Sequence, residues 1–201
     1  WLKSSGVGKG KKYFLGDLRT HESLFLLTEE FTEDGVWRNH YSFIFEDLPE
    51  NIIDICHYGF TEMVNNVIDH SGGEHIYISI VRNKEKITIF VMDDGEGIFK
   101  KIKRLCNLDD ERQALFELSK GKLTTDPDNH TGEGIFFTSR VFDEFEIDSK
   151  GIKFTHNDQY EFDFLLETEF SKHKAGTAVY MLIERKSKRE VKEIFDDFAE
   201  L

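Results

Sequence analysis

The segment that organises this chain reads Phe60-Thr61-Glu62-Met63-Val64-Asn65-Asn66-Val67-Ile68-Asp69-His70. Glu62 and Asn66 are four residues apart, so on an α-helix they lie on one face, about one turn from each other. A carboxylate and an amide stacked in this way suit a ligand that needs oxygen donors, such as Mg²⁺. An ordinary hydrogen-bonded pair on a solvated helix face is the alternative interpretation.

The composition is that of a globular chain with an acidic surface. The 201 residues fit one domain, or one domain with an appendage, and 39% of them are hydrophobic. The net charge of -13 argues against nucleic-acid binding through a broadly basic surface, although a local phosphate pocket remains compatible with it. Cys56 and Cys106 form neither a zinc spacing nor a disulfide framework, and the sequence shows no membrane-spanning or signal-peptide pattern. We therefore expect a soluble, cytoplasmic protein.

The first quarter of the chain predicts a tail and a helical extension. Residues 1–17 are interpreted as a tail or linker whose basic, glycine-rich turn at residues 6–12 resembles the wing of a winged-helix DNA-binding domain with helices upstream. A flexible linker is the alternative for this stretch. Apolar residues recur roughly helically over residues 17–31, and a second amphipathic segment begins at Glu33. We therefore predict an N-terminal helical extension over residues 18–48.

The third region, residues 49–201, predicts an alternation of helices and strands. A long helix is expected over residues 49–70, because Pro49 suits a first helical turn and Ser71-Gly72-Gly73 suits a helix end. Two strands joined by a hairpin loop are expected at residues 76–82 and 86–92. Further strands are expected at residues 145–149, 160–167 and 177–183, and further helices at residues 105–118, 132–142 and 187–198.

Two glycine motifs lie where strands and helices are expected to meet. Asp93-Asp94-Gly95-Glu96-Gly97-Ile98 directly follows a predicted strand, and Gly132-Glu133-Gly134-Ile135 opens a predicted helix. The polar residues 119–130 between them predict a mobile, lid-like loop. Each motif alone is common in proteins, and their order along the chain is what makes them informative.

Taken together, these features resemble the GHKL ATPases, the superfamily of DNA gyrase, heat-shock chaperones, histidine kinases and MutL proteins, with the anti-sigma-factor kinases nearby. The resemblance covers residues 49–184 and includes Gly176-Thr177 at the start of a late strand. It implies an α+β fold, a two-layer α/β sandwich known as the Bergerat fold. In that fold a mixed, mostly antiparallel sheet carries helices on one face, and the ATP lid is flexible.

The resemblance also implies ATP and Mg²⁺ as ligands and gives roles to three side chains. Glu62 would be the general base, Asn66 the Mg²⁺ ligand, and Asp93 the acceptor of the adenine amino group. Asp94 is the rival of Asp93, but only Asp93 has glycines two and four residues later. The glycines would let the backbone approach the base and the phosphates closely. The other candidate nucleotide contacts are Asp69, His70, Gly95, Gly97, Ile98, Lys122, Thr124, Gly132, Gly134, Ile135 and Thr177.

Details of the first motif separate the activities within the superfamily. Glu62 and Asp69 resemble the pattern of gyrase and MutL, which hydrolyse ATP, whereas His70 resembles the anti-sigma-factor kinases. The pair His21-Glu22 lacks the residues that follow the phospho-accepting histidine of sensor kinases, so we reject a sensor histidine kinase. We expect a Mg-ATP-binding regulatory ATPase whose lid controls a protein partner. A serine protein kinase and a nucleotide-sensing module of a DNA-binding regulator are the alternatives. Membrane binding and direct nucleic-acid binding by this chain are not expected, and homodimer formation stays open.

Overall fold

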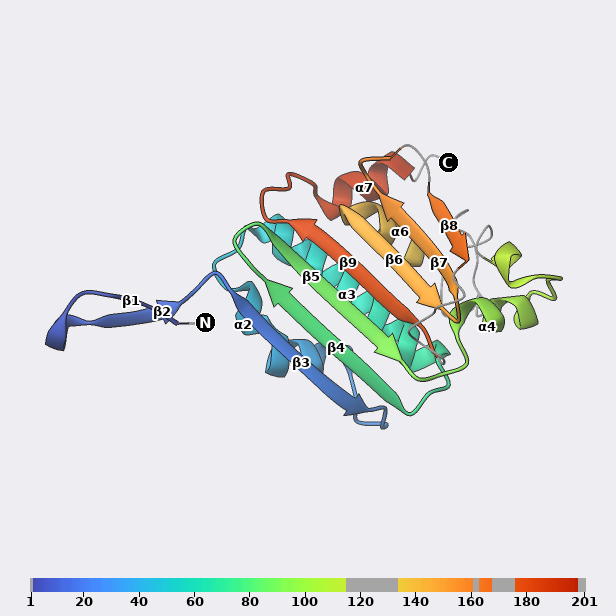
Figure 1. Cartoon of the computed structure of the whole chain (residues 1–201), viewed down its shortest axis with the longest axis horizontal. Coiled ribbons are helices and arrows are strands. Elements are labelled where there is room, and N and C mark those ends of the chain that lie inside the picture. The colour runs from blue at the N-terminus through green and yellow to red at the C-terminus, as the bar shows by residue number, and fades with distance from the viewer. Residues whose placement is uncertain (1, 115–133, 161–162, 168–175, 199–201) are drawn as a thin grey trace.

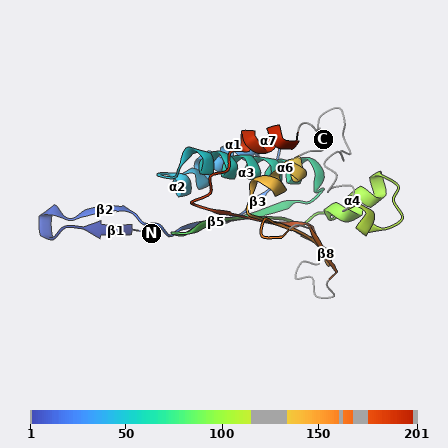
Figure 2. The same cartoon turned by 90° about the horizontal axis from the view of Figure 1, so that it is seen from above.

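The computed structural model describes residues 2–114, 134–160, 163–167 and 176–198. A seven-stranded sheet carries helices on one face, and a separate two-stranded hairpin projects from one side (Figure 1; Figure 2). The strand order across the sheet is β3-β4-β5-β9-β6-β7-β8, and every described pairing is antiparallel. The mostly antiparallel α/β sandwich predicted from the sequence is confirmed.

The elements are distributed along the whole described chain. The sheet is formed by β3 (Arg19–Leu26), β4 (His75–Arg82), β5 (Lys86–Asp93), β6 (Glu144–Ser149), β7 (Ile152–Asn157), β8 (Phe164–Glu167) and β9 (Ala178–Glu184). The helices are α1 (Glu33–Val36), η2 (Trp37–Tyr41), α2 (Ser42–Phe45), α3 (Glu50–His70), α4 (Ile98–Leu105), α6 (Gly134–Val141) and α7 (Val191–Phe198). The hairpin consists of β1 (Leu2–Ser5), the turn η1 (Gly8–Gly10) and β2 (Lys12–Leu15). Among the described residues, no helix has both the length and the apolar character needed to cross a membrane.

Helix α3 is the longest element packed on the sheet, and it agrees with the helix predicted at residues 49–70. Its apolar residues recur at helical spacing and form one buried face, and Phe60 within that face is fully buried. Burial of such a side chain stabilises the fold by about 1.5–3 kcal/mol. A Cβ at Gly59 would lie 2.3 Å from the ring of Phe142, so a glycine at this position lets α3 approach the chain that follows α6.

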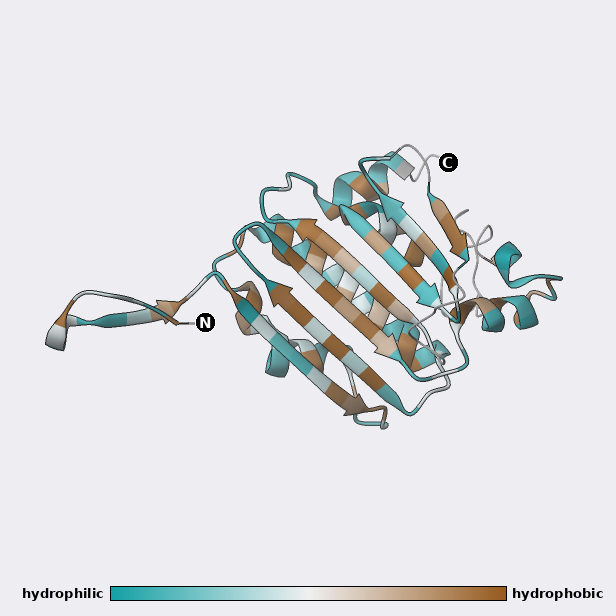
Figure 3. Ribbon diagram, viewed as in Figure 1, coloured by the Kyte–Doolittle hydropathy of each residue, from teal (hydrophilic) through white to brown (hydrophobic). Residues whose placement is uncertain are grey.

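The central strands alternate because the helices cover only one face of the sheet (Figure 2; Figure 3). Ile87, Ile89 and Val91 of β5 point into the core, and the residues between them point to the other face. Asp93 continues this inward-facing series at the end of the strand. The strand therefore directs a carboxylate, in place of an aliphatic side chain, into the layer between the sheet and the helices.

The helical prediction for residues 17–31 is wrong, because residues 19–26 form the edge strand β3. This strand pairs with β4 along its whole length, from Arg19 opposite Arg82 to Leu26 opposite His75. Leu24 and Leu26 are exposed and therefore do not form the buried face of a helix. The short apolar run fits either period, and pairing with β4 decides between them. The helical character predicted from Glu33 is confirmed by α1, η2 and α2.

Other boundaries also differ from the predictions. The helix expected at residues 105–118 is confirmed only over residues 111–114, because α4 ends at Leu105 and residues 106–110 are not helical; residues 115–118 lie outside the described residues. Strand β7 was not predicted, and β8 covers only the last part of the strand expected at residues 160–167. The predicted lid, residues 119–130, also lies outside the part of the chain that the structure describes.

Two buried arginines fasten the segment after α2 to the sheet. Arg82 of β4 is 0% exposed, and its guanidinium donates to the carbonyl groups of Ile44 and Glu46 and to the carboxylate of Asp47. Arg19 of β3 pairs with the same carboxylate. These cations hold the pKa of Asp47 below its ordinary value. The arrangement fixes the chain just before α3 and so fixes where α3 begins.

Candidate functional site

The buried carboxylate of Asp93 forms one end of the candidate site. β5 runs antiparallel to β9, so the last residue of β5 meets the segment that leads into β9. The backbone amide of Asp93 donates to the carbonyl oxygen of Thr177 at 3.0 Å, and its Oδ1 accepts from the amide of Gly95 at 2.8 Å. With 6% of its surface exposed, Asp93 is among the few buried acidic groups of the described chain.

Burial raises the pKa of the Asp93 carboxyl above its ordinary value of 3.8, and hydrogen bonds from the backbone amides of Gly95 and Thr177 oppose this shift. Desolvation disfavours the charged form, whereas amide donors favour it. The protonation of this carboxyl group therefore depends on its burial and on the hydrogen bonds that it accepts. Such a perturbed carboxylate at the end of a core strand is typical of a binding site.

Glycines let three chain segments meet at this carboxylate. Gly176 has φ +75°, and a Cβ there would lie 1.8 Å from the carbonyl oxygen of Asp93. A Cβ at Gly95 would lie 2.1 Å from the carbonyl oxygen of Ser71, which directly follows α3. Gly97 has φ +89° and packs against Ser149. Side chains at these positions would separate β5, β9 and the end of α3, so the glycines are needed for the close approach.

Thr177 connects this cluster to α4. Its hydroxyl oxygen accepts from the backbone amide of Ile98 at 2.9 Å, and Ile98 is the first residue of the helix. This hydrogen bond satisfies one of the amides that a helix N-terminus leaves unpaired. Thr177 therefore binds Asp93 through its backbone carbonyl and Ile98 through its side-chain hydroxyl. Ile98 is itself one of the predicted nucleotide contacts.

Three residues of this region were missed by the sequence analysis. The Ser71 carbonyl accepts from the amide of Glu96 at 3.1 Å, and Ser149 Oγ donates to the carbonyl of Gly176 at 2.8 Å. Lys101 Nζ donates to the carbonyl of His70 at 2.6 Å and satisfies the C-terminal turn of α3. Each of these hydrogen bonds joins segments that are far apart in the sequence, so a local sequence pattern could not predict the three residues.

The second half of the candidate site lies where α3 meets the start of α6. Gly134 is the first residue of α6, and a Cβ at this glycine would lie 2.1 Å from Glu62 Oε2. The carboxylate of Glu62 therefore lies directly against the backbone of the first helical turn. The next residue, Ile135, packs against the hydrophobic core and anchors this turn. The structure thus brings together two residues that the sequence separates by 72 positions.

Asn66 lies one turn beyond Glu62 on α3 and has a polar side-chain atom that no described residue pairs with. Its side-chain nitrogen is buried and has no hydrogen-bond partner among the described residues. A buried, unpaired donor is unfavourable by itself, so Nδ2 suits an acceptor that the described residues do not supply, such as a phosphate oxygen. The described residues contain no group of three or more His, Cys, Asp or Glu side chains that could hold a metal ion. The Oδ1 atom of the same side chain is an oxygen of the type that Mg²⁺ prefers, so the chemistry of Asn66 fits a single metal ligand among phosphates and waters.

Asp94, the rival of Asp93, has a structural role. Its carboxylate is exposed and accepts from the backbone amides of Glu74 and His75, at 2.8 Å and 3.0 Å. Its Oδ2 lies 2.8 Å from the His75 ring, and these contacts lower the pKa of the carboxyl. Asp94 therefore fastens the start of β4 to the end of β5, which leaves Asp93 as the inward-facing acid.

The remaining predicted contacts divide into two groups. Asp69 is exposed and His70 is half-buried in the last turn of α3, on the side of the Asp93 cluster. Lys122, Thr124 and Gly132 lie outside the described residues.

Comparison with known proteins bears on this geometry. Residues 43–155 match the family of histidine kinase-like ATPase domains, and this match covers α3, the Asp93 motif and the start of α6. A search of curated proteins finds no match. The family match spans more than half of the chain and confirms the GHKL-type resemblance, which implies an ATP-binding site. The chain belongs to the family of histidine kinase-like ATPase domains.

Proposed function

We propose that this chain is a regulatory module that binds Mg-ATP between α3, the Asp93 cluster and α6, and that it hydrolyses the bound ATP. The observation that carries the proposal is the position of Glu62. This carboxylate lies against the first turn of α6 and one turn from the unsatisfied Asn66, while α3 ends at the cluster that holds Asp93. A single rigid helix therefore connects a base-binding end with a phosphate-binding end.

Adenine recognition is assigned to Asp93. An ionised carboxylate accepts a hydrogen bond from the amino group of adenine, whereas guanine presents a carbonyl at that position. One oxygen of Asp93 is engaged by the Gly95 amide, so the carboxylate is held in a fixed orientation. Buried acceptors that are fixed in this way discriminate well, because the wrong base leaves them unpaired.

The phosphates are assigned to the first turn of α6 and to Asn66. Amides at a helix N-terminus attract anions, and Gly134, the first residue of α6, has no side chain of its own that would cover them. Asn66 would hold Mg²⁺ through its amide oxygen, and the metal supplies charge neutralisation to the triphosphate. The described residues of the site thus contribute one neutral ligand and leave the remaining metal positions to phosphate and water.

The hydrolytic step is assigned to Glu62 as general base. It would take a proton from the attacking water, whose oxygen then bonds to the γ-phosphorus as the bond to ADP breaks. Contact with the α6 backbone restricts where the carboxylate can lie. ATP hydrolysis would change the conformation of a surface to which a protein partner binds, and the module would regulate the partner in this way.

Calorimetric titration with ATP, ADP and GTP, each with and without Mg²⁺, tests the proposal. We expect Mg²⁺-dependent ATP binding, weak GTP binding, and loss of ATP binding in Asp93→Asn but not in Asp94→Asn. Glu62→Ala should bind ATP and fail to release phosphate, whereas Glu50→Ala, an exposed position on the same helix, should turn over at the parent rate.

Two results would contradict this assignment. Absence of any Mg²⁺-dependent adenine-nucleotide binding would show that the proposed site does not bind ATP. Unchanged phosphate release by Glu62→Ala would show that Glu62 is not the general base. Incubation with γ-labelled ATP and cell extract decides the fate of the phosphate, because label on a protein serine would indicate a kinase in place of a hydrolase.

A further inference from the structure

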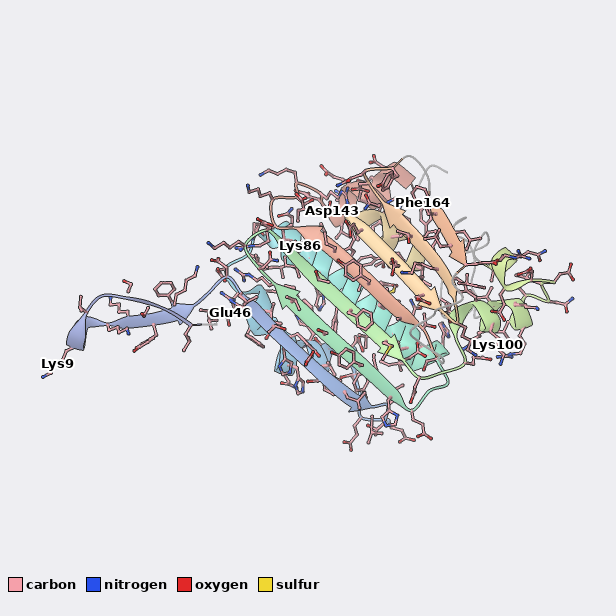
Figure 4. All side chains as sticks on the ribbon, in the orientation of Figure 1. Lys9, Glu46, Lys86, Lys100, Asp143 and Phe164 are labelled. Carbon is pink, nitrogen blue, oxygen red and sulfur yellow. The ribbon has the colours of Figure 1, made fainter. Side chains whose placement is uncertain are left out.

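The charges of this chain are divided in space. Residues 1–16 contain four lysines and no acidic residue, so all 39 acidic residues lie in the rest of the chain. These lysines are on the hairpin β1–β2, which projects from the sandwich with Lys9 at its far end (Figure 4). The four-residue strands alone extend it by about 13 Å. That exceeds the Debye length of about 8 Å at physiological ionic strength, so the acidic body is largely screened at the tip.

This hairpin, residues 2–15, is called the basic arm below. It has no core of its own, since Leu2, Tyr13 and Phe14 are exposed and Val7 is 93% exposed. Its described contact with the body is at the base, where Lys3 pairs with Asp17. An isolated two-stranded hairpin is marginally stable in water. We therefore expect a bound partner to stabilise the basic arm.

The shape and the charge of the basic arm suit a groove lined by phosphates. A two-stranded ribbon, with strands about 4.8 Å apart, fits the major groove of DNA, which is about 12 Å wide. Alternation along β2 places Lys12 on one face and Tyr13 on the other, and Lys11 lies 5.2 Å from the centroid of the Tyr13 ring. Lysines are thus available on both faces of the ribbon, as contact with the two backbones of a groove requires.

The tip distinguishes nucleic acid from a membrane as the partner. A hairpin that inserts into lipid carries large apolar side chains at its end. Here the turn consists of glycines with Val7 and Lys9, and the aromatic residues Tyr13 and Phe14 lie further back along β2. Gly6 and Gly8 have positive φ values and keep the turn narrow.

We propose that the basic arm binds duplex DNA and that Lys9, Lys11 and Lys12 contact its phosphates. Lys3 is engaged by Asp17 and is not included. Expected binding is non-specific, because phosphate contacts carry no sequence information. The sequence-based expectation that this chain does not bind nucleic acid rested on its total charge, and the separation of the arm from the body removes that ground. The proposal does not depend on ATP binding.

Fluorescence anisotropy with a labelled 20-base-pair duplex, without nucleotide and at 25–200 mM KCl, tests the proposal. Three phosphate contacts predict a slope of log K against log salt of about -2.7. The triple variant Lys9→Ser, Lys11→Ser, Lys12→Ser should bind at least about tenfold more weakly at 100 mM KCl, where the Debye length of about 10 Å is shorter than the arm. The matched control Lys84→Ser, Lys186→Ser, Lys188→Ser removes three exposed lysines of the body and should bind as the parent does.

Each other outcome would overturn the proposal. Absence of parent binding at every KCl concentration from 25 to 200 mM would show that the basic arm lacks this function. Equal weakening in both triple variants would show that binding depends on the total charge of the chain. Stronger association with phosphatidylserine vesicles than with the duplex would assign the arm to membranes. ATP affinity is measured in parallel by calorimetry, so that loss of DNA binding and loss of nucleotide binding remain distinguishable.

Discussion

We expect the replacement of Gly134 by alanine to separate the stability of this protein from the ATP turnover that we propose for it. The added Cβ would lie 2.1 Å from Glu62 Oε2, whereas ordinary contact begins at 3.4 Å. The nearest atom belongs to the end of a flexible side chain, so Glu62 can move aside without disturbing the core. Because the carboxylate must move by about 1.3 Å, and a displacement of about 1 Å can lower a rate about 100-fold, we expect kcat to fall about 100-fold.

Stability should respond in the opposite direction. Gly134 has no positive φ, and alanine favours helix over glycine by up to about 1 kcal/mol, less in the first turn. Urea denaturation should therefore give an unchanged or slightly higher free energy of unfolding. The Kd for ATP should stay within about threefold of the parent value, because the change acts on the base and not on adenine recognition.

The double variant with Glu62→Ala is the decisive control. If Gly134→Ala acts only by displacing Glu62, it should have no further effect on turnover once that carboxylate is absent. A further large loss in the double variant would place the effect of Gly134→Ala elsewhere. Loss of ATP binding in Gly134→Ala alone would also refute the reasoning, since it would show that the methyl group obstructs the phosphates.

Three further predictions concern the Asp93 cluster and the arginine pair. ATP affinity should decrease as the pH falls from 7 toward 4.5, because burial raises the pKa of Asp93 and its protonated form accepts poorly; an affinity independent of pH would contradict this. Gly176→Ala should lower the free energy of unfolding by about 2 kcal/mol, through its positive φ and the clash with Asp93. Gly72→Ala, with φ +64° and open space, should cost only about 1 kcal/mol in the same urea titration, and equal losses would argue against the clash. Asp47→Ala should cost about 2 kcal/mol, below the usual range for a broken buried pair because this carboxylate is 60% exposed. The exposed Asp34→Ala should change stability by less than about 1 kcal/mol, and a similar loss in both would indicate no special role for Asp47.

The parts of the fold that the sequence predicted depend on local patterns. Helix α3 and strands β4 and β5 have long runs of one period, so they were predicted within one or two residues. Strand β3 was predicted as helix because its few apolar residues fit either period. Its pairing with β4, which a local pattern does not show, makes it a strand. The buried Arg82 could not be expected inside a strand, since its partner Asp47 lies 35 positions earlier in the chain.

The candidate site shows the same division. Spacing within α3 relates Glu62 to Asn66, and the strand context selects Asp93 over Asp94, so these residues could be proposed from the sequence. Contact between Glu62 and Gly134 depends on how α3 and α6 pack, which the sequence pattern does not specify. Ser71 and Ser149 contribute through a backbone carbonyl and a hydrogen bond between distant segments, and neither has a distinctive residue type.

Both halves of the site are attached to one helix, and this has a mechanical consequence. Glu62 and Ser71 are nine positions apart, so α3 separates the α6 contact from the Asp93 cluster by about 13.5 Å. The helix is buried along this length by Met63, Val64 and Val67, which prevents it from bending independently of the sheet. A change at the Asp93 end that shifts Ser71 must therefore displace Glu62 relative to α6 or break the contacts of Ser71 with Gly95 and Glu96. With adenine and Glu62 in the roles that we propose, we expect adenine occupancy and the position of the Glu62 carboxylate to be coupled through α3, and substitutions in its buried face should alter ATP affinity and turnover together.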